Sequence, residues 1–296
     1  MSTSEESHQH QFERLSPKEC PGLQFVREQK LAAGLAKRFS SPQDLGGSCE
    51  VAELVAPCEG HSDATRAHLR DVFSRFVRHN LPVVIRGAVA SWPCVQRWSD
   101  EYICAGVGQS RIQVRRHPVA KSFGDVRAET PDTFHQTEEM SVVEYVRRAA
   151  EEPGSCYAAR IPIQAQADLE YIGTEVPPPD YLEYAAVVGV AVAGGAIMYW
   201  GGDGDSTPLH YDPHENFICV IDGTKKLRLY HPSCDDLLYP KDGSLFKYSA
   251  VDFAAYDVKE QFPLIRHACH VDVTLHKGDV FYLPCFWYVP SKLATT

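Results

Sequence analysis

Four two-residue turn signals divide the second half of the sequence into short segments that are rich in β-branched and aromatic residues. The turns are Asp203-Gly204, Asp222-Gly223, Asp242-Gly243 and Gly278-Asp279. Short segments between such turns are typical of β-sandwiches and β-barrels. The 296 residues, 44% of them hydrophobic, are enough to enclose one large core. We therefore expect one domain built around a barrel in residues 51–296.

The first half of the chain is predicted to supply helices. Residues 1–50 are polar and irregular, and part of this segment should be a disordered tail. Apolar residues recur at three- and four-residue spacing over Asp63–His79, which predicts a helix. A buried strand should follow at Leu81–Ile85, and a second helix should open with a capping box at Ser141 and Glu144. Helices first and strands later indicate an α+β fold dominated by the barrel.

Charge and cysteine usage argue against several function classes. The formal net charge of −10 disfavours a uniformly basic surface for nucleic acid. The ten cysteines form no C-x-x-C pair, so neither a zinc ribbon nor a thioredoxin-type site is expected. Met1–Glu6 is polar, unlike a secretory signal, which favours reduced thiols in the cytoplasm or nucleus. The uncharged run Tyr184–Trp200 is interpreted as buried strand rather than as a membrane helix.

His210 and Asp212 are the candidate metal ligands. One residue separates them, so on a β-strand both side chains point to the same face. An imidazole and a carboxylate supply two of the three ligands of the 2-His-1-carboxylate triad of non-haem iron oxygenases. A hydrogen-bonded structural histidine is the alternative for His210. The other histidines of this region are expected to be surface or structural residues: His214, His231, His267, His270 and His276.

The turn at Asp222-Gly223 adds Lys225 to this pair. Asp-Gly between two β-like runs predicts a two-residue hairpin, which would place Val220 opposite Lys225. Val220 lies an even number of residues from His210, and cross-strand partners share a face, so Lys225 should point to the metal side. A lysine among apolar groups needs a partner anion, which a dicarboxylate cosubstrate would supply. The alternative is a solvated charge beside a hairpin.

These motifs resemble those of the JmjC (cupin-like) oxygenases that use Fe(II) and 2-oxoglutarate. The likeness extends from about Phe76 to Tyr288. It is carried, in chain order, by Leu81–Ala88, Trp92-Pro93, Trp98-Ser99, Thr207–Asp212, Asn216-Phe217 and Gly278–Pro284. The resemblance implies a double-stranded β-helix, or jelly roll, with Fe(II) and 2-oxoglutarate as cofactors. His210 and Asp212 match the family's iron ligands.

Carried over position by position, the resemblance also implies a cosubstrate site. Lys225 matches the lysine that binds the 5-carboxylate of 2-oxoglutarate, and Thr207 matches a hydroxyl that assists it. Tyr157 matches a tyrosine that contacts the cosubstrate, with a core tyrosine as an equal alternative. Asn216 would support the metal site from the second shell of residues, although a strand-edge hydrogen bond would explain it as well.

Within the family, the small protein hydroxylases look nearest, first a lysyl and then an asparaginyl enzyme. The segments Arg86–Ser99 and His214–Asn216 favour the lysyl type. This implies side-chain hydroxylation of a protein substrate, with a GTP-binding protein as one candidate, in the cytoplasm and/or nucleus. No nucleic-acid or membrane partner is expected, and a full-length form could be a homodimer.

The sequence departs from the family at the third metal ligand. Val289 stands where the pattern has its second histidine, after Trp287-Tyr288, and valine has no lone pair to give. The last barrel strand is expected to be missing from the tail Pro290–Thr296. Three explanations stay open: an incomplete gene model or splice form, a protein that has lost turnover, or completion by another group such as His270 or His276. A non-catalytic cupin-like binding module is therefore the alternative function.

Overall fold

The computed structural model describes residues 51–56, 63–116, 136–177, 195–203, 205–241, 247–251, 253 and 258–294. The predicted N-terminal tail, residues 1–50, lies outside the described residues. So does most of the apolar run 184–200, of which Met198–Trp200 forms the short strand β6. Within the described ranges, no helix combines the length and the apolar character that a membrane span requires.

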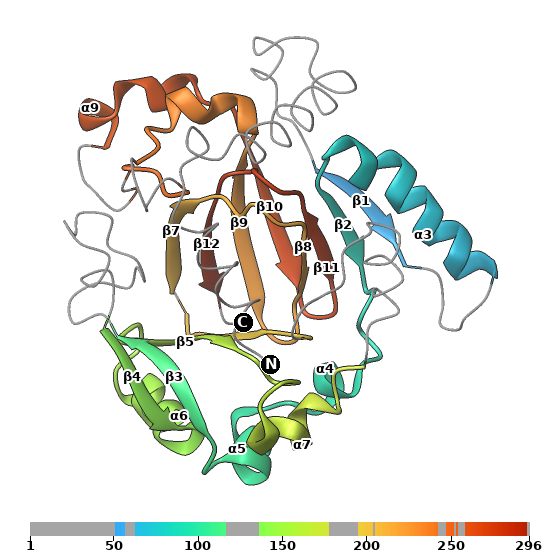
Figure 1. The fold of residues 1–296 in the computed structure, drawn as a ribbon, viewed down its shortest axis with the longest axis vertical. Coiled ribbons are helices and arrows are strands. Elements are labelled where there is room, and N and C mark those ends of the chain that lie inside the picture. Colours follow the sequence, from blue (N-terminus) through green and yellow to red (C-terminus); the bar gives the residue numbers. More distant parts are fainter. Residues whose placement is uncertain are drawn as a thin grey trace, which may run out of the picture.

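Two four-stranded sheets face each other as in a jelly roll (Figure 1). The first sheet has the strand order β1-β2-β11-β8, and the second has the order β10-β9-β12-β7. Their strands are β1 (Ala52–Val55), β2 (Val83–Arg86), β7 (Ser206–His210), β8 (Asn216–Cys219), β9 (Thr224–Tyr230), β10 (His270–His276), β11 (Val280–Leu283) and β12 (Val289–Ala294). The α+β jelly-roll prediction is thus confirmed.

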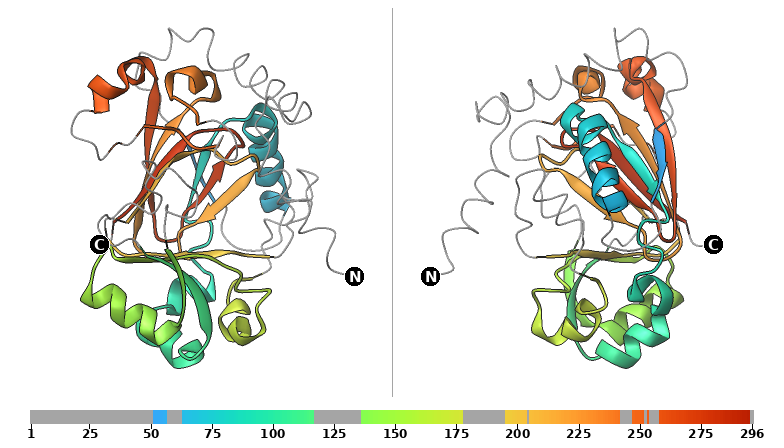
Figure 2. Two further views of the ribbon diagram at one scale, coloured as in Figure 1. Left: turned by 60° about the vertical axis from the view of Figure 1, so that its left-hand side comes forward. Right: turned by 90° about the vertical axis from the view of Figure 1, so that its right-hand side faces the viewer.

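A third sheet lies across one end of these two sheets, as Figures 1 and 2 show. Its strand order is β4-β3-β5-β6, and β6 leads into β7. The remaining strands are β3 (Arg111–Arg116), β4 (Gln136–Ser141) and β5 (Cys156–Ile161). The helices near this sheet are α4 (Pro93–Arg97), α5 (Asp100–Val107), α6 (Val142–Glu151), η4 (Ala167–Leu169) and α7 (Glu170–Gly173). The third sheet was not predicted from the sequence.

The predicted helices are present. The first is α3 (Asp63–Arg75), which a short 3-10 helix, η2 (Val77–His79), extends. The second, α6, is capped by Ser141, whose hydroxyl accepts a hydrogen bond from the backbone N–H of Glu144 at 3.2 Å. The Glu144 carboxylate pairs with Arg148 and does not close the capping box. In the described part of the chain after β9 lie the short helices η5 (Pro232–Leu237), α9 (Val258–Gln261) and η7 (Pro263–His267).

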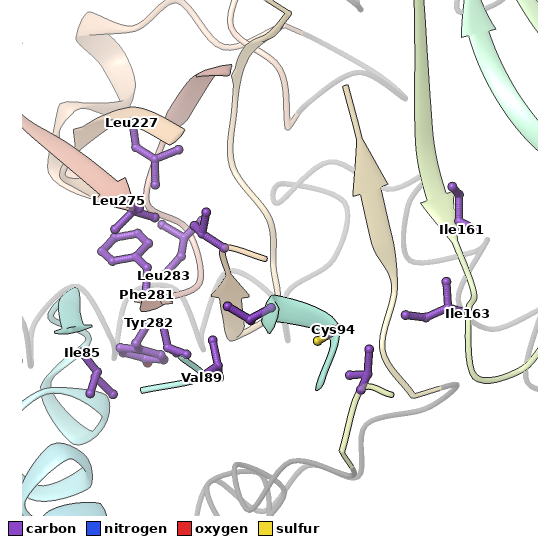
Figure 3. Packing of buried hydrophobic residues seen from close by; sticks show 14 of the residues in the cluster. Ile85, Val89, Cys94, Ile161, Ile163, Leu227, Leu275, Phe281, Tyr282 and Leu283 are labelled. Carbon is purple, nitrogen blue, oxygen red and sulfur yellow. The ribbon is translucent and has the colours of Figure 1, made fainter. Parts of the chain in front are cut away.

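The main core fills the space between the two jelly-roll sheets and continues towards the third sheet. In Figure 3, Leu227 and Leu275 approach from the second sheet, and Ile85, Phe281, Tyr282 and Leu283 lie on the first. The same cluster continues through Val89 and Cys94 to Ile161 and Ile163. These side chains are all nearly inaccessible to solvent. Burial of this contiguous apolar surface is the main stabilising contribution to the fold.

The predicted hairpin at Asp222-Gly223 is wrong. β8 pairs with β11, whereas β9 pairs with β10 and β12, so the turn joins strands of opposite sheets. Val220 instead exchanges backbone hydrogen bonds with the Gly278-Asp279 turn: its N–H donates to the Asp279 carbonyl at 3.0 Å, and its carbonyl accepts from Gly278 at 2.8 Å. A local turn signal cannot distinguish a hairpin from a crossing between sheets, because the sheet partners lie far away in sequence.

The tail was expected to lack a strand, but residues 289–294 form β12. This strand lies between β7 and β9 and makes the second sheet continuous. Val289 pairs with His210, and Ser291 pairs with both Thr207 and Leu227. The register with β7 shifts between Val289 and Ser291, and proline in a strand is tolerated at such irregularities. The strand was not predicted because the segment contains Pro290 and its apolar residues do not alternate with polar ones.

The Asp279 side chain connects the end of β2 in the first sheet to the turn after β10. Its carboxylate is almost fully buried and accepts hydrogen bonds from the backbone N–H groups of Gly87 at 3.1 Å and His276 at 2.9 Å. It also forms an ion pair with Arg86, whose guanidinium reaches Glu53 on β1. One carboxylate thus satisfies three donors from two segments, Arg86-Gly87 and the turn at His276, which explains the Gly-Asp motif at this place.

We expect Asp279→Ala to lower the free energy of unfolding by about 3 kcal/mol, because it leaves buried donors without an acceptor. Asp222→Ala is the matched control: Asp222 is exposed and pairs only with the exposed Lys277 among the described residues, so its loss should cost at most about 0.5 kcal/mol. Urea unfolding measures both. Equal stabilities of the two variants would contradict this role of Asp279.

Candidate functional site

His210 ends β7 in an orientation suited to metal binding. Its Nδ1 lies 2.8 Å from the carbonyl oxygen of Pro208. In the neutral tautomer Nδ1 donates to this oxygen, which leaves the lone pair of Nε2 for a metal. The imidazole stacks on Tyr248, with ring centroids 5.7 Å apart. Leu209 and Tyr211 are buried in a separate apolar cluster, so His210 faces the opposite side of the strand.

Asp212 follows just after β7 and is held by its neighbours. The side-chain amide of Asn216 donates to Asp212 Oδ2 and to the backbone carbonyl of His214, both at 3.3 Å. The backbone carbonyl of Asp212 accepts a hydrogen bond from the N–H of Phe286 at 2.8 Å. Asn216 therefore contacts the carboxylate that it was predicted to support.

Val289 lies directly opposite His210 in the pairing of β12 with β7. Cross-strand neighbours share a face, so the Val289 side chain occupies the place from which a third ligand would reach the metal, and it is buried. His270 and His276 are exposed on β10, which β9 and β12 separate from β7. Within the ranges that the structure describes, no three His, Cys, Asp or Glu side chains come together as a metal site.

Lys225 lies on the inner face of β9. It alternates with the exposed Lys226 and shares its face with the buried Leu227 and Leu229; its cross-strand neighbour on β10 is the buried Leu275. Lys225 is itself half-buried, and the loss of hydration lowers its pKa to about 8. Its ammonium has no hydrogen-bond or ion-pair partner among the residues described. The structure thus places Lys225 on the predicted face, although the hairpin from which we inferred it does not exist.

Thr207 reaches the same face through the irregularity in β7. It pairs with Ser291, which pairs with Leu227, two residues from Lys225. Residues three apart on a regular strand point to opposite faces. The register shift lets Thr207 and His210 share the inner face, as an inserted residue does in a β-bulge.

Tyr157 lies on the third sheet, next to Tyr199. It is buried on β5, and its ring centroid lies 6.4 Å from that of Tyr199 on β6. Burial raises the pKa of both hydroxyls; for Tyr199 the guanidinium of Arg160 opposes the rise and the carboxylate of Asp212 adds to it. Tyr199 therefore lies within electrostatic reach of Asp212 and beside Tyr157.

A protein-family model described as a cupin-like domain matches residues 69–289, about three quarters of the chain. This chain belongs to the cupin-like JmjC family. Lysine-specific demethylase 8 of Xenopus tropicalis is 27% identical over 226 residues, which cover 75% of the chain and 46% of that protein. Lysine-specific demethylase JMJ30 of Arabidopsis thaliana is 29% identical over 215 residues, which cover 70% of the chain and 46% of that protein.

A third relative is the bifunctional peptidase and (3S)-lysyl hydroxylase JMJD7 of Homo sapiens, 25% identical over 247 residues that cover 71% of the chain and 72% of that protein. The chain spans about half the length of the two demethylases. The JmjC prediction is confirmed. At family level, the chain is a JmjC oxygenase domain, and JmjC oxygenases generally use Fe(II) and 2-oxoglutarate.

The residues of this JmjC chain fit one of these cofactors better than the other. A half-buried, unpaired ammonium on an apolar face, Lys225, suits the carboxylate of 2-oxoglutarate. His210 and Asp212 suit iron, but the third position holds the isopropyl group of Val289. Iron held by two protein ligands is bound less firmly and with less fixed geometry than iron in a complete facial triad.

Sequence reasoning missed a carboxylate that joins the two loops of the JmjC site. Glu215 accepts hydrogen bonds from the Tyr282 hydroxyl at 2.6 Å and from the backbone N–H of Cys285 at 3.2 Å. It thereby ties the loop after β7, which carries Asp212, to the loop before β12, which leads to Val289. Glu215, Tyr199 and Tyr248 have no signal in a single sequence, because their roles depend on partners far along the chain.

The five other histidines of the β-rich half were predicted to be surface or structural residues, and their burial agrees with this. His231 is buried, and burial lowers its pKa to about 4; its Nδ1 lies 2.8 Å from the hydroxyl of Ser233. The others are exposed: His214, His267, His270 and His276.

Proposed function

We propose that this chain carries the site of a Fe(II)- and 2-oxoglutarate-dependent protein hydroxylase, with lysyl side chains as the favoured target. The observation that carries the proposal is Lys225, an unpaired cation on the inner face of the sheet that also presents His210. The contact of His210 Nδ1 with the Pro208 carbonyl and the support of Asp212 by Asn216 add to it. Relatives named as lysine demethylases and a lysyl hydroxylase favour lysine.

The spacing of the two ends of the site suits a dicarboxylate. His210 pairs with Val289 and Lys225 pairs with residue 293, four residues further along β12. At the rise of a β-strand the two positions are roughly 13 Å apart, which a lysine side chain and a five-carbon dicarboxylate bridge together. In this proposal, Lys225 and Thr207 hold the distal carboxylate, and the chain orients the cosubstrate and excludes water. The bound cofactors supply the oxidative chemistry.

Val289 supports a second candidate function, a cupin-like module that binds a partner without turnover. A buried valine opposite His210 removes a ligand but leaves the surroundings of Lys225 intact. We rank it second because the geometry around His210, Asp212 and Lys225 has no evident purpose in a module that only binds protein. The partner proposed in either case is a protein, with a GTP-binding protein as one candidate, in the cytoplasm or nucleus. The net charge of −10 disfavours nucleic acid.

Calorimetric titration of the purified chain tests the proposal, with 2-oxoglutarate and with Mn²⁺ as a redox-inert substitute for iron. We expect 2-oxoglutarate to bind, Mn²⁺ to bind weakly, and each to strengthen the binding of the other. Iron-dependent release of CO2 from 2-oxoglutarate should be at background. Binding of 2-oxoglutarate with no influence of Mn²⁺ would favour the binding module, and no binding of 2-oxoglutarate under any condition would reject the hydroxylase site.

A further inference from the structure

Arg115 differs from the two other arginines of β3. Arg111 forms an ion pair with Glu139 at 3.1 Å, and Arg116 forms one with Glu138 at 3.2 Å. The half-buried guanidinium of Arg115 has neither an ion pair nor a hydrogen bond in the part of the chain that the structure describes. Glutamates of β4 thus neutralise Arg111 and Arg116, whereas Arg115 has no anion beside it among the described residues.

The position of Arg115 directs it towards the site. It pairs in register with Tyr157 on β5, whereas the neighbouring Val114 pairs with Ala158, and both of these pack into the main core. Arg115 therefore lies on the face of the third sheet that carries Tyr157. Figure 2 shows this sheet across the end of the two jelly-roll sheets.

Electrostatics agree with this placement. The Tyr199 side chain is only partly covered, and this partial loss of hydration raises the pKa of its hydroxyl. The positive charge of Arg115 is among the influences that oppose the rise, while the Asp212 carboxylate adds to it. The same guanidinium opposes the rise in the pKa of Tyr157 that burial causes. Arg115 and Asp212 therefore act on one tyrosine, Tyr199, which is more than half exposed and can contact a ligand.

We propose that Arg115 is a carboxylate-binding residue of this site, which takes either a carboxylate of the cosubstrate or an acidic side chain of the protein substrate. The inference rests on the proposed function. A planar guanidinium binds a carboxylate through two parallel hydrogen bonds. Because Lys225 already suits the distal carboxylate of 2-oxoglutarate, Arg115 provides for a second anionic group.

The test compares Arg115→Met with Arg111→Met, a control that removes a neighbouring arginine with an existing partner. One arm measures 2-oxoglutarate binding by calorimetry in the presence of Mn²⁺. The other measures fluorescence polarisation of two labelled lysine-centred peptides, one flanked by Glu and Asp, the other by Gln and Asn. We expect Arg115→Met to weaken the binding of 2-oxoglutarate or of the acidic peptide about fivefold, the effect of roughly 1 kcal/mol for a partly exposed ion pair, and Arg111→Met to change neither.

The arm that responds identifies the source of the carboxylate. If the acidic peptide is that source, Arg115→Glu should reverse the preference between the acidic peptide and a peptide flanked by lysines. The proposal would be overturned if Arg115→Met left both affinities unchanged, or if Arg111→Met lost as much affinity as Arg115→Met. It would also be overturned if the wild-type chain bound neither probe. A single-stranded oligonucleotide that binds more tightly than the acidic peptide would overturn it too. If 2-oxoglutarate fails to bind but the acidic peptide depends on Arg115, the hydroxylase proposal fails and this one stands.

Discussion

Val289→His should raise the affinity of the chain for Mn²⁺ or Fe(II) by on the order of 100-fold or more, since loss of a mere outer-shell partner already costs 10- to 100-fold. The new imidazole would stand opposite His210, on the face that His210 shares with its cross-strand partner. Asn216 already positions Asp212, and Glu215 already joins the loop after β7 to the loop before β12. Anaerobic calorimetry measures the affinity.

Val289→Leu is the matched control, because it changes the volume at this position but adds no lone pair. It should leave the weak metal affinity of the chain unchanged. A second readout separates folding from binding: metal at 100 times its Kd should stabilise the Val289→His chain by about 2.7 kcal/mol. A folded Val289→His chain with no gain in affinity over Val289→Leu would show that position 289 is not the missing ligand position.

Lys225→Met should weaken 2-oxoglutarate binding by roughly 10- to 100-fold, the effect of losing a charged hydrogen bond to a carboxylate, about 1.5–3 kcal/mol. Methionine keeps the length and the apolar stem of lysine and removes only the ammonium. Lys226→Met is the control, because Lys226 is exposed and points away from Lys225. Calorimetry with and without Mn²⁺ measures both variants. Equal affinities of the two would contradict a cosubstrate site at Lys225.

The same substitution should stabilise the unliganded chain, with a defined pH dependence. The pKa of Lys225 is lowered from 10.5 to about 8 by burial, so between these values the unfolded chain binds more protons than the folded chain. Stability of the wild type therefore rises with pH across this window. Below pH 8 the folded wild type bears the full cost of burying a charged ammonium, about 3 kcal/mol at most. Lys225→Met has no ammonium and does not bear this cost. The difference in free energy of unfolding between the two chains should therefore fall towards zero as the pH rises from 8 to 10.5. Parallel pH profiles of stability would contradict this prediction.

Local patterns made part of this structure predictable. The three- and four-residue apolar spacing before His79 gave a helix, because such spacing depends only on neighbouring residues. The alternation of Lys225, Leu227 and Leu229 predicted the inner face of β9 for the same reason. The H-x-D spacing predicted both candidate ligands on one strand, but β7 ends at His210, before Asp212. Residue-by-residue likeness to the JmjC family identified Val289 as the departure, and the pairing of β12 places Val289 opposite His210.

Features that depend on distant partners could not be predicted. The turn at Asp222-Gly223 indicates a reversal but not which sheet the next strand joins, so the hairpin was wrong. β12 contains Pro290 and has no alternating pattern, and its place is set by β7 and β9 on either side. Arg115 is indistinguishable from Arg111 and Arg116 in the sequence. It differs only because β4 offers glutamates to the other two.

We propose that the site is that of a 2-oxoglutarate oxygenase that lacks a metal ligand at position 289. The decisive measurement is iron-dependent release of CO2 from 2-oxoglutarate, compared between the wild-type chain and Val289→His. We predict release at background for the wild type and clear release for Val289→His, abolished by adding Lys225→Met. Robust release by the wild-type chain, or none by a folded Val289→His chain that binds iron and 2-oxoglutarate, would contradict it.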